Sequence, residues 1–304
     1  MKIIFMGTPS FSVPILEALN EKYEILLVVS QPNQRGKKNK ALEPPVATKA
    51  KELGLNLAQP DKISTLYETF KELNADVLVT AAYGQFVPSK MLKLFKKCLN
   101  VHGSLLPKHR GGAPIQRAIM EGDKTTGITI MEMVKQMDAG RMYAKAEIPI
   151  LDTDNNETMF TKLSIVGRDL LLNSIEDIVN GKIMGIEQNE AEATISPNIA
   201  DFEEKIDFNQ PARTVFNHIR GLAMNPGAYA LINDARLKVY SSKEVLDDSD
   251  ALPGTVLLAK KRLLVKCQDN AIEILEVKPE GKQIMPSPSF LNGQRLFEVG
   301  DTFK

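Results

Sequence analysis

The chain has 304 residues, about twice the usual length of one domain, so we expect two domains, each with a core of its own. Hydrophobic residues make up 43% of the chain and charged residues 25%, a composition that excludes a mainly disordered, collagen-like or mucin-like protein. Because 38 basic and 38 acidic residues give a formal net charge of zero, a nucleic-acid partner would need a local basic patch.

The first half of the chain alternates short apolar runs with helical patterns, which is typical of a parallel sheet covered by helices. The apolar runs are β-branched and almost continuous, as in strands that are buried on both faces. The expected strands are residues 3–6, 25–30, 77–81, 99–102 and 128–133. The expected helices are residues 13–20, 46–53, 64–73, 114–121 and 158–180. We therefore predict an α/β domain with an open, mostly parallel, Rossmann-like sheet.

The pattern changes in the second half. Residues 183–205 are irregular and are interpreted as the connection between domains, and a helix at 211–222 follows. The strands expected beyond this helix are residues 229–232, 236–240, 254–258, 263–266 and 271–277. Short strands at close spacing favour a small, all-β, OB-like barrel. We predict a first domain at 1–188, a linker at 189–206 and a C-terminal barrel at 207–304.

The cysteine count and the N-terminus indicate the cellular compartment. Cys98 and Cys267 are the only cysteines and lie far apart in apolar surroundings, which argues against a disulfide framework and a zinc site. The first apolar run stops at Gly7 and Pro9, too early for a secretory signal, and no window approaches ~20 uninterrupted apolar residues. We expect a cytoplasmic protein with no metal and no membrane attachment.

Two common nucleotide-binding motifs are missing from the sequence. The string GTPSF follows the first expected strand, where a dinucleotide fingerprint would begin, but it lacks the second and third glycines of G-x-G-x-x-G. No G-x-x-x-x-G-K-[ST] string occurs either. We interpret residues 7–9 as a tight turn between a strand and a helix.

The most informative polar residues stand at the end of the strand expected at 99–102. Asn100 and His102 are two apart, so on a strand they point to the same side. Both side chains can donate hydrogen bonds to a carbonyl oxygen that is becoming negative. Asp138 follows the next strand, and its carboxylate could hold the imidazole and favour its charged form. By spacing alone, a buried structural histidine and a simple turn aspartate remain open as alternatives.

Four strings, NVHGSLLP, RGGAPIQRAI, TGITIM and MDAG, follow one another in the first half of the chain. Together they resemble the formyltransferase domain that uses 10-formyltetrahydrofolate. The resemblance implies that Asn100, His102 and Asp138 are the catalytic residues. It implies a folate site formed by Ser104, Leu105, Leu106 and Pro107, and, through the string AYGQFVP, by Gln85, Phe86 and Val87.

Further strings extend the resemblance over essentially the whole chain. IIFMGTPSFSVPILEAL, SQPN, PGAYA, EVKPEGKQIM and FLNG are similar to the methionyl-tRNA formyltransferase family. This resemblance implies transfer of the formyl group of 10-formyltetrahydrofolate to the α-amino group of methionyl initiator tRNA, for translation initiation. The alternatives are a formyltransferase acting on a sugar-nucleotide amine and a non-catalytic RNA-binding protein.

A basic stretch follows the second expected strand. Residues 35–51 hold six basic residues and one acid, Glu43, for a net charge of +5. Such a patch attracts phosphates, although a solvated face is the alternative. The resemblance implies that this stretch contacts tRNA. The expected tRNA-binding residues are Arg35, Lys37, Lys38 and Lys40 here, and Lys260, Lys261 and Arg262 at an edge of the barrel. Phe208 and Asn198 depart from the tryptophan and lysine common in the family.

The expected mechanism needs no covalent bond to the enzyme. The amine attacks the formyl carbon, Asn100 and His102 stabilise the oxygen, and Asp138 orients and charges His102. A bound water can carry the proton from the amine to the departing folate nitrogen. Ser104 as a nucleophile is the other enzyme mechanism, but the sequence shows no nucleophile elbow around it.

Overall fold

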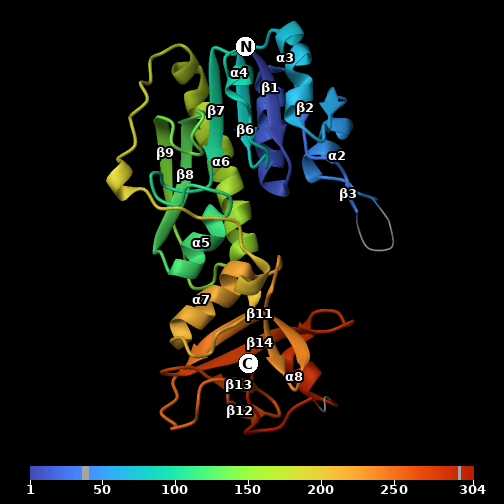
Figure 1. Ribbon diagram of the computed structural model, residues 1–304, viewed down its shortest axis with the longest axis vertical. Coiled ribbons are helices and arrows are strands. Elements are labelled where there is room, and N and C mark those ends of the chain that lie inside the picture. The colour runs from blue at the N-terminus through green and yellow to red at the C-terminus, as the bar shows by residue number, and fades with distance from the viewer. Residues whose placement is uncertain (36–40, 294–295) are drawn as a thin grey trace. The chain divides into compact units, whose positions relative to one another are not determined.

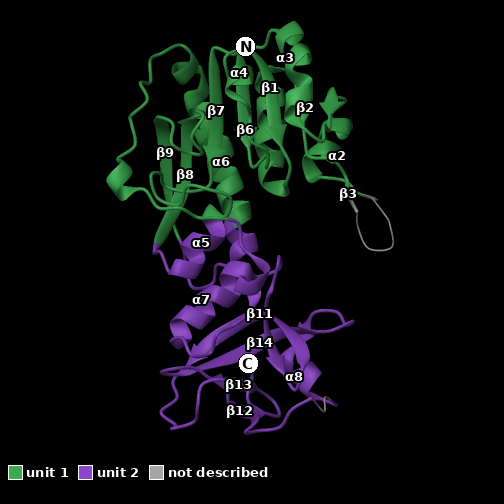
Figure 2. Ribbon diagram, viewed as in Figure 1, with its two compact units in different colours: residues 1–114, 125–149, 160–197 green, residues 115–124, 150–159, 198–304 purple. Residues whose placement is uncertain are grey.

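The computed structural model describes residues 1–35, 41–293 and 296–304. These residues form two compact units (Figure 1, Figure 2). The first unit contains residues 1–114, 125–149 and 160–197, and the second contains residues 115–124, 150–159 and 198–304. Two short segments within residues 1–188, which the sequence assigns to the first domain, thus group with the second unit. Within the described residues, no helix combines the length and the apolar character needed to cross a membrane.

The first unit is built on one sheet of seven strands, in the order β5-β2-β1-β6-β7-β8-β9. The strands are β1 (Lys2–Gly7), β2 (Glu24–Val29), β5 (Leu57–Ala58), β6 (Val77–Ala81), β7 (Lys97–His102), β8 (Thr125–Glu132) and β9 (Met142–Pro149). Neighbours from β5 to β7 pair in parallel, whereas β8 and β9 are antiparallel. The predicted mostly parallel sheet is confirmed. The sequence analysis did not predict β5 or β9.

Helices cover both faces of this sheet, which explains why its central strands are apolar throughout. They are α1 (Val13–Lys22), α2 (Pro45–Glu52), α3 (Tyr67–Leu73), α4 (Ser89–Leu92) and α6 (Asn156–Val179), with 3-10 turns at Ser10–Ser12 and Ile63–Leu66. The helix α6 runs along the sheet beside β7 (Figure 1). Gly167 allows this close approach, because a Cβ there would lie 2.9 Å from Cγ1 of Val101. The short strands β3 (Gln34–Arg35) and β4 (Ala41–Leu42) pair with each other outside the main sheet.

The second unit is an antiparallel sheet curled around an apolar core. Its strands are β10 (Ala228–Ile232), β11 (Ala235–Val245), β12 (Val256–Ala259), β13 (Leu263–Lys266), β14 (Ala271–Pro279) and β15 (Met285–Pro286). The order is β10-β11-β14-β13-β12, and β15 pairs with β14. The helices of this unit are α5 (Pro114–Glu121), α7 (Ala212–Leu222) and α8 (Ser287–Leu291). The all-β character predicted for the C-terminal part is confirmed.

The last residues of the chain connect the two ends of this curled sheet. The backbone of Lys304 exchanges two hydrogen bonds with Leu231 of β10. The amide of Phe303 donates to the carbonyl of Gly254, and the amide of Val256 in β12 donates to the carbonyl of Asp301. The Phe303 ring packs into the core against other aromatic rings. The C-terminal residues therefore satisfy backbone groups that the outer strands would otherwise expose.

Candidate active site

Strand β7 positions Asn100 and His102, and the pairing around it explains their orientation. Val101 lies between them and packs beneath α6, where Gly167 leaves room for it. Because side chains alternate along a strand, Asn100 and His102 both point away from that helix. They stand where the parallel part of the sheet ends, since β7 pairs in parallel with β6 and antiparallel with β8. Polar side chains at the carboxyl end of such a sheet are placed to meet a ligand.

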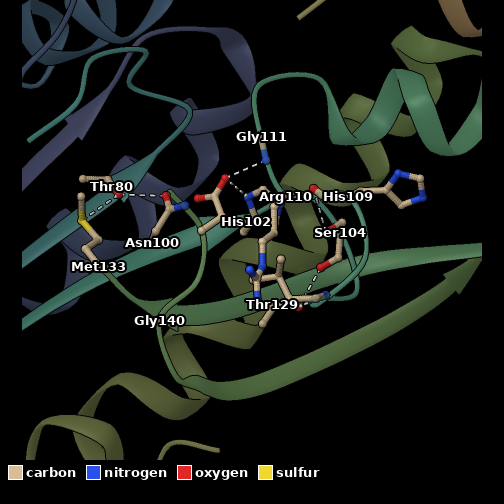
Figure 3. Close-up of polar contacts among 12 residues, drawn as sticks. Thr80, Asn100, His102, Ser104, His109, Arg110, Gly111, Thr129, Met133 and Gly140 are labelled. Carbon is tan, nitrogen blue, oxygen red and sulfur yellow. Dashed lines mark hydrogen bonds and ion pairs between the residues drawn. The ribbon is translucent and has the colours of Figure 1, made fainter. Parts of the chain in front are cut away.

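A buried threonine on the neighbouring strand orients the Asn100 amide (Figure 3). The Thr80 hydroxyl donates a hydrogen bond of 2.8 Å to Oδ1 of Asn100, and it also lies 3.4 Å from the Met133 sulfur. Because Oδ1 is engaged, the amide presents the hydrogens of Nδ2 on the side away from Thr80. Asn100 is half-buried, and its contact with Thr80 orients the amide before a substrate binds. The amide therefore needs no rearrangement to donate to a substrate oxygen.

Both ring nitrogens of His102 face oxygen atoms. Nε2 donates to the backbone carbonyl of His109 at 2.9 Å, and Nδ1 lies 3.7 Å from Oδ2 of Asp138. The ring is only 5% exposed, so bulk water screens the carboxylate poorly. Because a carbonyl and a carboxylate are both acceptors, the two contacts are satisfied together when both nitrogens carry protons.

Asp138 reaches His102 from a tight turn after β8. Its backbone has φ of 51°, an uncommon conformation for an aspartate, and its Oδ2 accepts a hydrogen bond of 2.9 Å from the amide of Gly111. Gly140 brings the turn against the sheet, since a Cβ there would lie 1.9 Å from the carbonyl oxygen of Glu132. The structure therefore brings Asn100, His102 and Asp138 together, although Asp138 is distant in the chain from the other two.

The segment 104–107 forms the loop directly after His102. Ser104 is fully buried, and its hydroxyl donates to the carbonyl of Lys108 at 2.6 Å. The Thr129 hydroxyl donates to the Ser104 carbonyl at 2.7 Å and accepts from the Leu106 amide at 3.1 Å. Lys145 donates to the Leu106 carbonyl. Leu106 and Pro107 are also buried and Leu105 is half-buried, so this loop is held rigidly and the Ser104 hydroxyl is engaged with the backbone.

The segment 82–87 follows β6 and adds an apolar surface near the same sheet edge. Gln85 is held by hydrogen bonds, accepting from the Ile63 amide at 3.0 Å and donating to Gln31 at 3.2 Å. Val87 is buried, whereas 55% of Phe86 is exposed. Burial raises the pKa of the Tyr83 phenol to about 12, so this ring is neutral at any physiological pH.

Comparisons with known proteins identify the family. Residues 1–175 match the family model "Formyl transferase", and residues 198–295 match "Formyl transferase, C-terminal domain". A methionyl-tRNA formyltransferase from Streptococcus pyogenes serotype M28 is 47% identical over 308 residues, covering 99% of this chain and 98% of that protein. The chain belongs to the methionyl-tRNA formyltransferase family. A family member from Streptococcus pneumoniae is 46% identical over 309 residues and covers 99% of each chain.

Solved structures of other proteins share the fold of this chain at low sequence identity. An N-formyltransferase from Helicobacter canadensis, solved with folinic acid and dTDP-3-aminofucose, has a TM-score of 0.71 at 18% identity, covering 90% of this chain and 98% of that one. HypX from Aquifex aeolicus, solved with tetrahydrofolic acid, has a TM-score of 0.66 at 18% identity. That alignment covers 100% of this chain and 50% of HypX.

The basic residues expected to bind tRNA differ in how much of them the structure describes and in how exposed they are. Lys37, Lys38 and Lys40 lie outside the described residues, and for Arg35 the structure describes only the backbone, in β3. Lys260 and Lys261 are exposed in the turn between β12 and β13. Arg262 forms an ion pair with Glu273, which also contacts Lys243 at 3.2 Å.

Sequence reasoning missed several residues that hold the site of this formyltransferase together. Thr80, Gly111 and Gln188 each contact a candidate catalytic residue or its turn. Gly111 lies inside the string RGGAPIQRAI, which marked the region without giving this residue a task. Thr80 is a polar residue in an apolar strand, which is a usable signal. Gln188 falls in the irregular stretch 183–205, where the sequence pattern offers no signal.

Proposed function

We propose that the chain transfers the formyl group of 10-formyltetrahydrofolate to the α-amino group of methionyl initiator tRNA, giving formylmethionyl-tRNA. The observation that carries this proposal is the convergence of the Asn100 amide with the close pair of His102 and Asp138, 3.7 Å apart, at the carboxyl end of β7. Membership in the methionyl-tRNA formyltransferase family supports both the reaction and the acceptor.

Each of the three side chains has a task that its contacts support. Asn100, oriented by Thr80, donates from Nδ2 to the formyl oxygen as that oxygen gains negative charge. His102, between two acceptors, is placed beside the amide to offset charge that develops on the formyl oxygen. Asp138 holds the ring in this position from 3.7 Å. Donors fixed before the reaction act without reorganising, which is why such sites stabilise developing charge effectively.

The transfer forms one carbon–nitrogen bond and breaks another. The new bond joins the formyl carbon to the amine, and the bond to the folate nitrogen breaks, so one proton must pass from the amine to that nitrogen. A free α-amino group has a pKa of about 7.7–8.0, and esterification lowers this pKa, so much of the acceptor is neutral and nucleophilic near pH 7. The proton can travel through a water molecule beside Asp138 and His102, without a covalent enzyme intermediate.

The residues near the site suit a folate. 10-Formyltetrahydrofolate carries a formyl group on a nitrogen that departs when an amine attacks the formyl carbon, and its pterin has a planar pyrimidine ring with hydrogen-bonding edges. The exposed ring of Phe86 offers an apolar face for such a ring. We assign Gln85, Phe86 and Val87 and the loop Ser104, Leu105, Leu106 and Pro107 to this site.

We assign tRNA contact to exposed basic side chains. Lys260 and Lys261 lie in an exposed turn and can bind phosphates, whereas Arg262 already contacts Glu273. The basic stretch that begins at Arg35 has a net charge of +5 over residues 35–51 and would add to this attraction. The reaction belongs in the cytoplasm, where charged initiator tRNA enters translation.

The decisive experiment follows the acceptor itself. Purified protein is incubated with 10-formyltetrahydrofolate and methionyl initiator tRNA, the ester is hydrolysed, and the released methionine is analysed by mass spectrometry. We expect a mass increase of one formyl group, and none when tetrahydrofolate replaces the formyl donor. Formylation of a nucleotide-linked amino sugar with none of the tRNA would instead support the sugar-nucleotide reaction. Binding of tRNA with no turnover on either acceptor would support a non-catalytic RNA-binding protein.

A further inference from the structure

The segment 186–196 holds the two loops of the candidate active site, and we call it the strap. It lies between the two matched family regions, which end at residue 175 and begin again at residue 198. The sequence pattern reads most of it as linker. In the structure, however, the strap belongs to the first unit and contacts both the turn that carries Asp138 and the loop that follows Ser104.

On one side the strap holds the Asp138 turn. The backbones of Ile186 and Met142 exchange two hydrogen bonds, of 2.8 and 2.9 Å, which fixes the strap along the start of β9. Two residues later, Nε2 of Gln188 donates to the carbonyl oxygens of both Asp138 and Gly140, each at 2.7 Å. One side-chain amide therefore joins the two ends of the turn that presents the catalytic carboxylate.

On the other side the strap holds residues 109–110. The Arg110 amide donates to the Thr194 carbonyl at 2.9 Å, and the Ser196 amide donates to the Arg110 carbonyl at 2.6 Å. The Thr194 hydroxyl accepts from the His109 amide at 2.9 Å. This pairing fixes the backbone whose His109 carbonyl accepts from His102. It also fixes the backbone just before Gly111, whose amide donates to Asp138.

The Arg110 side chain links the part of the strap that holds the Asp138 turn to the part that holds residues 109–110. Arg110 is 3% exposed, and its Nε donates to Oε1 of Gln188 at 2.9 Å. The guanidinium also binds both carboxylate oxygens of Glu190, at 3.0 and 2.8 Å, and this contact lowers the pKa of Glu190. Because Oε1 of Gln188 accepts from arginine, its Nε2 must face the two carbonyl groups. The orientation of the Gln188 amide is therefore unique.

From this geometry we propose that Gln188 is a positioning residue for formyl transfer, and that the strap acts on catalysis only through the groups that contact the two loops. Gln188 touches neither substrate in this proposal. It acts by holding the Asp138 carboxylate at its place beside His102. The inference rests on the proposed function, because it assumes that Asp138 and His102 carry the reaction. Losses of about 10–100-fold are usual when such supporting contacts are removed.

Two substitutions distinguish the effect of the hydrogen bonds that Gln188 donates from the effect of its side-chain volume. Gln188→Ala removes both hydrogen bonds to the turn and the acceptor for Arg110. Gln188→Glu keeps the volume and the contact with Arg110, but it places a carboxylate oxygen against two carbonyl oxygens, which repel it. The matched control is Glu187→Gln, because Glu187 is the preceding residue and its carboxylate contacts Arg141 on the surface. The control leaves the Asp138 turn untouched.

We expect Gln188→Ala to lower kcat about 10–100-fold while KM for both substrates stays within about twofold. Gln188→Glu should lower kcat at least as far, and Glu187→Gln should match the wild type. In an Asp138→Asn background, Gln188→Ala should cost little more, because a residue that acts through Asp138 has nothing left to position. If Gln188 had a purely structural role, the fold-losses in kcat of Gln188→Ala and Asp138→Asn would multiply in the double variant, and the KM values would rise.

The inference is overturned if kcat of Gln188→Glu stays within about twofold of the wild type, or if the losses of Gln188→Ala and Asp138→Asn multiply fully. Should Gln188→Ala lose its secondary structure by circular dichroism, Gln188→Glu alone decides, since it keeps volume and the arginine contact. Failure of the proposed function looks different. In that case the wild type and Glu187→Gln both fail to formylate methionyl-tRNA.

Discussion

The candidate catalytic cluster of the first unit and the exposed basic turn of the second differ in how the fold holds their polar groups. Asn100, His102 and Asp138 are oriented by Thr80, His109 and Gly111, each of which belongs to another segment or loop. Lys260 and Lys261 extend into solvent from a turn between two short strands. The cluster depends on direction and distance, whereas the turn depends on charge alone. Substitutions should therefore affect kcat at the cluster and salt-dependent affinity at the turn.

The largest effect expected on this comparison comes from Asp138→Asn. Asparagine can still accept the Gly111 amide, so the turn should keep its shape, but it cannot give His102 a negative partner. We expect turnover to fall about 10²–10⁴-fold, with folate affinity and melting temperature close to the wild type. Single-turnover kinetics with saturating substrates measure this loss. Near-normal turnover would remove Asp138 from the mechanism.

A smaller loss is expected from Asn100→Ala, which removes one fixed donor. Loss of one such donor to a developing oxyanion commonly lowers kcat about 10²–10³-fold. Thr80→Val, which keeps Asn100 but removes the hydroxyl that orients it, should cost only about 10-fold. Thr80→Ser is the control, because it keeps that hydroxyl. Equal losses for Thr80→Ser and Thr80→Val would show that the packing of the threonine matters and not its hydrogen bond.

At the basic turn, the double variant Lys260→Ala/Lys261→Ala should raise KM for methionyl-tRNA several-fold at low salt and leave kcat unchanged. The slope of log affinity against log salt should fall by about 0.7–0.9 for each phosphate that the variant no longer binds. Titrations at several salt concentrations measure it. Lys71→Ala/Lys93→Ala removes the same charge from exposed positions in the first unit and serves as the control. The same effect in both variants would mean that net charge, and not this turn, attracts the tRNA.

The smallest effect concerns His218, a half-buried histidine outside the cluster. Its Nε2 donates to the Glu203 carbonyl at 2.7 Å, but burial lowers the pKa of the ring below its ordinary value of 6.5. As pH falls below that value, the unfolded chain binds the proton first, so the free energy of unfolding decreases. The melting temperature should therefore drop as the pH falls below about 6.5, and less so in His218→Gln. Parallel curves for both proteins would contradict this assignment.

The strands and the spacing of Asn100 and His102 could be predicted from the sequence, because both depend on neighbours in the chain. Apolar runs indicated β1, β2, β6 and β7, and alternation along β7 placed the two side chains on one side. The pairing with Asp138 could only be proposed from the sequence, since a turn after a strand does not reveal which edge it returns to. The resemblance to the family supplied that step, and the distance of 3.7 Å supports it.

The strap shows where the sequence pattern was insufficient. Residues 183–205 carry no helical or strand period, so they were interpreted as a connection. The hydrogen bonds that join Gln188 and Thr194 to the loops of the candidate site connect residues about 50 to 85 positions apart. No local pattern encodes such contacts, because irregular segments are specified by the polar groups they meet and not by a repeat of apolar residues.

By itself, the sequence determined the two kinds of sheet, the pair of donors on β7 and the family to which the chain belongs. The tertiary structure decided which groups orient those donors, that the Ser104 hydroxyl is engaged with the backbone, and that residues 186–196 contact the turn that carries Asp138. The physical reason is the range of the forces involved. Hydrophobic periodicity acts between neighbours in the chain, whereas a buried polar group must find its partner wherever the packed fold brings one within about 3 Å.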